Sequence, residues 1–226
     1  MSNQRNERFD TLQPGISISS KNSTNGTLGL IVYDKKNDFA PCILSNWHVL
    51  AARKFKLGSM RRGANTYQPG RINTNNRPRR ANKVGKLVRH NRRWDCAIAR
   101  ITNRDFITEQ FETGVLITKT RIPKIGDIVE KSGTRTGVTR ARVVGVGLKW
   151  VSLKPVEEGN PNDDEISQGG DSGSIWYDPV THEGLILHSK GENDENDDPE
   201  AESASGLILQ TVLEKLSVSL VPEQAV

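Results

Sequence analysis

The chain has 226 residues, of which 34% are hydrophobic and 26% charged, and its formal net charge is +5. This length accommodates one large or two small β domains around a buried core, and the composition excludes wholesale disorder. The N-terminus, MSNQRNERFD, has no apolar leader and no window is long enough to span a membrane, so we expect a soluble, cytoplasmic protein.

Short apolar segments, each bounded by Gly, Pro, Asn or Asp, follow a polar N-terminal arm, residues 1–26. A strand running into a short helical turn is predicted at 42–52, and long loops with one short hairpin at 53–82. Many short strands indicate an all-β barrel or sandwich rather than alternating strands and helices. The other predicted strands are 27–35, 83–90, 95–101, 114–118, 127–133, 140–147, 150–155, 173–178 and 184–189.

One helix is predicted, at residues 209–220 near the C-terminus. Its apolar residues Leu209, Val212, Leu213 and Leu216 recur at helical spacing, which is typical of a helix with one buried face.

The two cysteines, Cys42 and Cys96, each lie inside an apolar run. Their separation fits neither a metal site nor a redox motif, so we expect small buried side chains in the reduced state. The sequence therefore predicts no metal and no cofactor.

Charge is divided sharply along the chain. Residues 51–93 hold fourteen Lys or Arg and no acid, whereas residues 192–202 hold seven acids and no base. Such blocks are usually solvated loops. The basic block also suits nucleic acid, although it lacks the interleaved aromatic rings of a stacking surface. Because the charges are opposite, we expect the two blocks to contact each other.

The stretch ISQGGDSGSIW, residues 166–176, places Ser172 among glycines. It reads either as a hairpin turn or as a turn whose backbone N–H groups converge on an oxyanion. A nucleophilic serine needs a histidine base and a carboxylate that orients it. His48 ends an apolar strand, and Asp95 opens another. The order His, Asp, Ser is that of chymotrypsin, and differs from the orders of α/β-hydrolases and subtilisin.

The segments ILSNWHVLA, DCAIARI and GGDSGSIW resemble the three catalytic blocks of the trypsin/chymotrypsin-fold serine proteases, and the resemblance covers roughly residues 27–217. In detail the chain looks closest to intracellular trypsin-like proteases of the plant Narrow Leaf type and their bacterial relatives. The segments GTLG, LSNWHVLA, EKSGTRTGVTRARV and SASGLILQTVLEKL carry that closer match.

The resemblance implies that Ser172 is the nucleophile, His48 the general base and Asp95 the carboxylate that orients His48. The oxyanion hole would be the N–H groups of Gly170 and Ser172, with Gly169, Gly170 and Gly173 permitting the tight turn.

The same resemblance implies two antiparallel six-stranded β-barrels with a C-terminal helix as a brace. We place the first barrel at 27–120 and the second, with the helix, at 121–226. The disulfides of secreted trypsins are missing, which favours a reducing compartment. Secreted trypsins pair the aspartate before the serine with a new N-terminus, so Asp171 must find another partner or solvent.

By position, the resemblance also places the pocket for the residue before the scissile bond. His188 matches a histidine of glutamate-specific relatives, and nearby polar groups suit a substrate carboxylate. A satisfied core histidine and an apolar pocket are the alternatives. The candidate substrate-binding residues are Ile166, Ser167, His188, Ser189 and Lys190.

The function that we predict is a serine endopeptidase that acts on a protein or peptide substrate through an acyl-enzyme intermediate. One alternative is a catalytically silent protease fold that binds peptides. The other is a basic nucleic-acid-binding protein, which the absence of a recognised binding motif disfavours.

Overall fold

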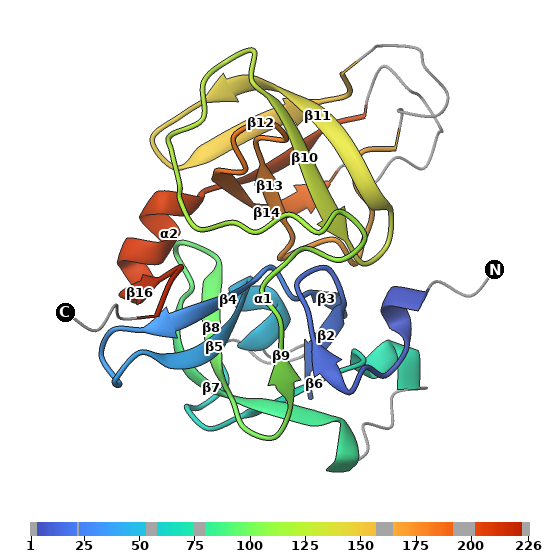
Figure 1. Ribbon diagram of the computed structural model, residues 1–226, viewed down its shortest axis with the longest axis vertical. Helices are drawn as coiled ribbons and strands as arrows, with labels where there is room; N and C mark the ends of the chain where they lie inside the picture. The colour runs from blue at the N-terminus through green and yellow to red at the C-terminus, as the bar shows by residue number, and fades with distance from the viewer. Residues whose placement is uncertain are drawn as a thin grey trace.

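Two β bodies are stacked on one another in the computed structural model, one from each half of the chain (Figure 1). Every strand pair within these two bodies is antiparallel. The structure describes residues 4–21, 23–52, 58–74, 80–156, 165–191 and 202–222.

The second body is a closed six-stranded barrel, as the resemblance implies. Its interior is filled by inward-facing apolar residues such as Val143, Leu153 and Trp176. In barrel order the strands are β10 (Ile128–Gly133), β11 (Gly137–Val146), β12 (Trp150–Lys154), β15 (Ala204–Ile208), β14 (Gly184–Gly191) and β13 (Ile175–Tyr177).

The first body is a sheet of eight strands, in which two-residue strands form both edges. Together with the closed barrel and the C-terminal helix, it confirms the predicted all-β fold. The strand order is β16 (Val218–Ser219), β4 (Leu30–Asp34), β5 (Ala40–Ser45), β8 (Cys96–Ile101), β7 (Lys83–Asn91), β6 (Asn65–Tyr67), β2 (Ser17–Ser20) and β3 (Gly26–Thr27).

Short elements complete the described chain. A parallel pair of two-residue strands forms a separate small sheet. The pair is β1 (Thr11–Leu12) and β9 (Asp105–Phe106), the helices are α1 (Trp47–Leu50) and α2 (Leu209–Leu216), and the 3₁₀ turns are η1 (Gln4–Asn6), η2 (Arg71–Thr74) and η3 (Arg80–Asn82).

Helix α2 lies at one side of the molecule, where the two bodies meet (Figure 1). Its four predicted apolar residues are all buried, so its amphipathic pattern is confirmed. They pack in one cluster with Leu30 and Leu44 of the first body and with Leu187 and Leu207 of the second. Because one face of the helix contacts both bodies, it braces them as expected.

The helix ends earlier than predicted. Ser217 takes a left-handed conformation, with φ at 50°, immediately after Leu216. Val218 and Ser219 then pair with Tyr33 and Asp34 of β4. Strand pairing therefore takes residues that the apolar pattern assigned to the helix, and it returns the end of the chain to the first body.

Two further expectations are wrong. Residues 114–118 form no strand, because Val115 and Ile117 are sheltered by packing against the core between the bodies rather than by sheet pairing. Residues 17–20, expected in a polar arm outside the barrel, form β2 within the first sheet. Serine is small and can be buried there because its hydroxyl finds a partner, as Ser17 does with Asn73.

The segment that connects the two bodies is fixed to the second one by Arg121. Its guanidinium lies 2.6 Å from Asp127, 2.7 Å from Asp178 and 3.4 Å from Glu183. The exact division of the chain at residues 120 and 121 stays a prediction.

Most of the acidic block 192–202 and part of the basic block 51–93 lie outside the described residues, so the contact predicted between them does too. In the part of the chain that is described, no helix has both the length and the apolarity needed to cross a bilayer.

Candidate active site

His48 is presented by α1, the short helix that follows β5. Its Nδ1 lies 3.0 and 2.9 Å from the two carboxylate oxygens of Asp95, and its backbone N–H donates to Asp95 Oδ1 at 3.1 Å. The His48 side chain is 31% exposed and that of Asp95 15%. The pair is therefore sheltered, while the imidazole keeps an open edge.

Asp95 occupies the turn before β8 with a φ of 36°, a conformation that Asp tolerates better than most residues. Its backbone carbonyl accepts from Asn46 Nδ2 at 3.0 Å, and its N–H donates to Arg92 at 3.2 Å. Hydrogen bonds therefore join the segment that carries His48 to the turn that carries Asp95, and they fix the geometry of the pair.

Ser189 of β14 joins the pair to Ser172. Its hydroxyl donates to Asp95 Oδ2 at 2.6 Å, and its backbone carbonyl accepts from Ser172 Oγ at 3.3 Å. Within the described residues no hydrogen bond joins Ser172 Oγ directly to His48. Through Ser189, Ser172 is nevertheless linked to the pair of His48 and Asp95 at the junction of the two bodies.

The turn around Ser172 depends on two glycines. Gly170 has φ +130° and Gly173 φ +97°, whereas Gly169 has an ordinary φ. A Cβ on Gly173 would lie 2.1 Å from Ser45 Oγ and 2.5 Å from Thr27 O. Gly170 and Gly173 thus permit the tight turn, as predicted. Gly169 has neither a positive φ nor a close neighbour that would require glycine.

The N–H groups of Gly170 and Ser172 are left without acceptors in the described part of the chain. Other N–H groups of the same turn are used: Asp171 donates to Gln168 O, Gly173 to His188 O and Ser174 to Asp171 O. Thr27 fixes the turn from the first body, because its N–H donates to Ser172 O at 2.8 Å and its hydroxyl to Gly170 O at 2.9 Å.

Asp171 is fully buried and finds its partner in Lys131 of β10, which is also fully buried, at 3.4 Å. The carboxylate also accepts from the backbone N–H groups of Arg135, Thr136 and Gln168 at 2.7, 3.2 and 3.0 Å. The Thr136 hydroxyl donates to it at 2.7 Å.

These contacts decide the ionisation of Asp171. Burial by itself raises the pKa of the carboxyl, but the ammonium of Lys131 and the hydrogen bonds outweigh it and hold the pKa below its usual value. Burial in turn lowers the pKa of Lys131, while Asp171 opposes that shift. A charged, hydrogen-bonded carboxylate therefore anchors the turn that presents Ser172.

The candidate substrate-binding residues are grouped near the end of β14. Ser167 is fully buried and its Oγ has no hydrogen-bond partner in the described residues. It lies so close to Gly191 that a Cβ there would be 2.3 Å from Ser167 Oγ. Ile166 is fully buried in the core of the second barrel. Lys190 is exposed.

His188 is almost fully buried, and its Nδ1 accepts from Trp176 Nε1 at 3.3 Å. Burial is the main reason why the pKa of His188 falls to about 3, and the ammonium of Lys131 adds to the shift. The ring is neutral at pH 7. Because Nδ1 accepts a hydrogen bond, the proton sits on Nε2, which has no acceptor within the described chain.

Both cysteines are buried and unpaired, as expected, and burial raises the pKa of each thiol to about 12. They are therefore inert at neutral pH. Among the described residues there is no group of three or more His, Cys, Asp and Glu side chains suited to a metal ion.

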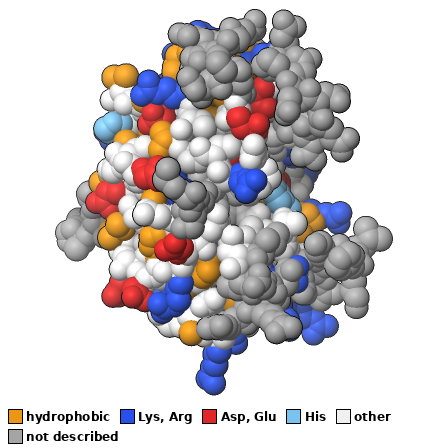
Figure 2. Space-filling view, turned by 90° about the vertical axis from the view of Figure 1, so that its right-hand side faces the viewer, with side chains coloured by type: hydrophobic (Ala, Val, Ile, Leu, Met, Phe, Trp, Pro, Cys, Tyr) orange, Lys and Arg blue, Asp and Glu red, His pale blue; other side chains and the backbone are white. Residues whose placement is uncertain are grey.

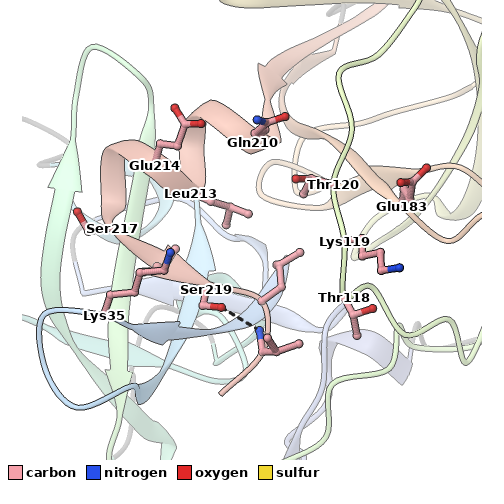
Figure 3. A pocket seen from close by; sticks show the side chains of 13 residues that line it. Lys35, Thr118, Lys119, Thr120, Glu183, Gln210, Leu213, Glu214, Ser217 and Ser219 are labelled. Carbon is pink, nitrogen blue, oxygen red and sulfur yellow. Dashed lines mark hydrogen bonds between the residues drawn. The ribbon is translucent and has the colours of Figure 1, made fainter. Parts of the chain in front are cut away.

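A separate cavity of about 680 Å³ lies between α2, β16 and residues 118–120 (Figure 3). Its rim carries Lys35 and Lys119 as well as Glu183 and Glu214, so opposite charges balance there. On the face drawn in Figure 2, hydrophobic side chains occur in small groups between charged ones. Neither feature selects a particular ligand.

The structure brings His48, Asp95 and Ser172 together from residues far apart in the sequence. Sequence reasoning missed Lys131 and Thr136, the partners of Asp171. The available signal was weak: Lys131 is a lone lysine inside the predicted strand 127–133, where alternation leaves its direction ambiguous.

Solved structures of serine proteases share this fold. Thermobifida fusca protease A has a TM-score of 0.65 at 15% identity, with 94% of this chain and 100% of that chain covered. A Nocardiopsis protease has a TM-score of 0.63 at 12% identity, covering 92% and 98%. A protease described as glutamic-acid-specific, with a histidine triad in substrate binding, has a TM-score of 0.66 at 17% identity, covering 93% and 100%.

No family model and no curated protein matches the chain. At these identities the likeness establishes the two-barrel fold of the chymotrypsin-like serine proteases. The predicted kinship with the plant Narrow Leaf type stays a prediction.

Proposed function

We propose that this chain is a serine endopeptidase in which Ser172, His48 and Asp95 hydrolyse a peptide bond. The observation that carries the proposal is the chain of contacts from His48 through Asp95 and Ser189 to Ser172. It lies beside a turn in which the N–H groups of Gly170 and Ser172 have no acceptor among the described residues. The fold shared with solved serine proteases supports it.

In the proposed acylation step, Ser172 Oγ attacks the carbonyl carbon of the scissile bond while His48 Nε2 takes the hydroxyl proton. Asp95 accepts from Nδ1–H, which fixes the tautomer and stabilises the imidazolium. The intermediate then loses the amine, to which His48 returns the proton. Water attacks the acyl ester with His48 again acting as base, which releases the acid and restores Ser172.

The oxyanion of each tetrahedral intermediate would accept from the N–H groups of Gly170 and Ser172. Each such donor contributes roughly 3 kcal/mol of transition-state stabilisation, judged from the usual cost of deleting one. Asp171, held by Lys131 and four other donors, keeps these N–H groups in place before the substrate arrives.

We further propose that the residue before the scissile bond is Glu or Asp. Ser167 Oγ and His188 Nε2–H have no partner among the described residues, and they suit a substrate carboxylate. One similar structure is described as a glutamic-acid-specific protease with a histidine triad. Here a neutral His188 paired with Trp176 would serve as a hydrogen-bond donor rather than as a cation.

A fluorophosphonate probe tests the activity. Wild type should be labelled at Ser172, whereas Ser172→Ala should not be, and His48→Ala should react at least a hundredfold more slowly.

Peptides that differ only in the residue before the cut (Glu, Asp, Leu or Lys) test the specificity of the pocket. Higher kcat/KM for Glu and Asp, lost in His188→Ala while Leu peptides are still cleaved, would support it; a preference for Lys or Leu would contradict it.

A second candidate function is a silent peptide-binding module. It is favoured by one observation, namely that Ser172 Oγ donates to Ser189 O instead of to His48. Folded wild type that binds peptides but neither reacts with the probe nor cleaves any peptide would establish this alternative.

A further inference from the structure

Lysine ammonium groups lie over tryptophan rings beside the candidate site, and only Lys190 among these residues is also a candidate substrate-binding residue. Lys149 Nζ is 4.8 Å from the ring centroid of Trp150 and 5.6 Å from that of Trp94. Lys190 Nζ is 5.5 Å from the Trp150 ring. Lys215 Nζ is 5.8 Å from the Trp94 ring. We call these five residues the lysine–tryptophan patch.

The patch is assembled from distant segments. Trp94 immediately precedes Asp95, and Lys149 and Trp150 lie where β12 begins. Lys190 follows Ser189 on β14, and Lys215 is in the last turn of α2. Because the patch adjoins both Asp95 and Ser189, it is continuous with the candidate site.

The positive charge of the patch is not neutralised by the described part of the chain. None of its three lysines forms an ion pair with a described Asp or Glu; Lys149 donates to the backbone carbonyl of Arg93. A ring face attracts an ammonium while its N–H donors remain available to an acceptor. Arg92 and Arg93, both exposed, add positive charge on the turn that holds Trp94.

A free strand edge leads from the site toward the patch. The pairing of β14 with β13 stops at Leu187. The backbone of His188 then accepts a hydrogen bond from the Gly173 N–H and donates one to Ser174 O. Beyond that point, Lys190 and Gly191 pair with β15 on one edge of β14, but they have no described strand partner on the opposite edge. Such an edge accepts an extended peptide.

The direction of such a peptide follows from antiparallel pairing. Along β14, the chain moves away from Ser172 as it passes from Ser189 to Gly191. An antiparallel peptide therefore approaches Ser172 as its own chain advances, so residues beside Lys190 and Gly191 precede the scissile bond. Residues two to four before the cut therefore lie along the edge that leads to the patch, at about 3.3 Å per residue.

We propose that the lysine–tryptophan patch binds acidic side chains of the substrate, at the third and fourth residues before the scissile bond. This inference rests on the proposed function and extends it from one pocket to a substrate class: peptides with an acidic stretch ahead of the cut. Charge complementarity and the proximity of the patch to Asp95 and Ser189 favour this occupant.

The test uses matched fluorogenic peptides that carry one common residue before the cut. One pair has Glu-Glu or Gln-Gln at the third and fourth positions before the bond, and a second pair has the same residues after it. Wild type should cleave the first Glu-Glu peptide with about five- to tenfold higher kcat/KM than its Gln-Gln partner at low salt. The ratio should fall to about twofold or less in 0.5 M NaCl, because salt screens exposed charges.

The variant Lys149→Glu/Lys215→Glu should bring this ratio to one or below, with the Gln-Gln peptide cleaved within about twofold of the wild-type rate. Lys36→Glu is the matched control: Lys36 is an exposed lysine on the β4–β5 turn, outside the patch, and this variant should keep the wild-type ratio. The second peptide pair should show no comparable preference.

Equal rates for the two peptides of the first pair, a preference only in the second pair, or an unchanged ratio in the double variant would overturn the inference. If wild type cleaves nothing, the proposed function fails, and the patch is tested by binding. Fluorescence anisotropy with Ser172→Ala should then give a Kd about five- to tenfold lower for the Glu-Glu peptide, and equal Kd values would reject the patch.

Discussion

Asp171 and His188 are buried ionisable residues whose charge states are set by their surroundings. Asp171 stays charged because five donors surround it, whereas His188 stays neutral because burial and Lys131 disfavour its cation. Both folded-state pKa values lie below the ordinary ones. The two residues therefore make the stability of the protein depend on pH in the same direction.

We predict that the free energy of unfolding falls as pH falls below about 6.5. Below that pH, His188 becomes protonated in the unfolded chain but stays neutral in the folded protein. The free energy of unfolding therefore falls by up to about 1.4 kcal/mol per pH unit. Below about pH 4, protonation of Asp171 in the unfolded chain makes the loss steeper. Urea unfolding between pH 7 and 3 measures both effects.

His188→Gln should flatten the dependence between pH 6.5 and 4, and His182→Gln, at an exposed turn, is the control. Burial also lowers the pKa of His90, so some dependence should remain in His188→Gln. A slope that is the same in wild type and His188→Gln would contradict the assignment.

The turn from Gly169 to Gly173 is the element on which the site depends. Its conformation is imposed by a close approach of the two bodies, since Gly173 lies against Ser45 and Thr27 of the first one. The three glycines look equivalent in the sequence but differ in the structure. Gly169 is exposed, with open space where a Cβ would be.

Gly173→Ala should therefore destabilise the protein by about 2–4 kcal/mol, the sum of a left-handed backbone penalty and overpacking. It should also lower kcat/KM by tenfold or more, because the N–H of Ser172 shifts. Gly169→Ala should change stability by less than about 0.5 kcal/mol. Chemical denaturation and peptide hydrolysis measure the two effects, and similar results for both variants would count against this account.

At the scale of the whole molecule, the N-terminal segment is tied to the second barrel through Arg5. This side chain is 2% exposed and donates to Ser132 Oγ at 2.7 Å and to Glu112 at 2.6 Å, while stacking over Phe111 at 5.0 Å. Ser132 is next to Lys131, the partner of Asp171. Arg5 thus supports the strand that anchors the turn that presents Ser172.

Arg5→Met should lower the free energy of unfolding by about 2–4 kcal/mol, because it leaves Ser132 and the partly exposed Glu112 without a donor. It should also lower kcat more than it raises KM, since the turn around Ser172 becomes less well fixed. Arg8→Met is the control, because Arg8 is 47% exposed and its one ion pair within the described residues is with the exposed Asp10. Equal, small effects of both substitutions would show that the N-terminal segment does not support the site.

Local pattern accounts for the parts of the fold that were predicted correctly. The α2 residues recur at helical spacing, and the strand at 96–101 is a mostly apolar run that follows a turn. The failures at 17–20 and 114–118 have the opposite cause. A polar strand and an apolar connection are each buried by contacts with segments far away in the chain.

The sequence by itself determined the order His48, Asp95, Ser172, the glycines that let the serine turn form, and the apolar face of α2. Each of these can be read from the linear order and local spacing of residues. The tertiary structure alone decided that Lys131 meets Asp171, that Ser189 links Asp95 to Ser172, and that three lysines gather over two tryptophans. Those contacts join residues of different strands and helices, and only the packing of the two bodies against each other and against α2 brings them within reach.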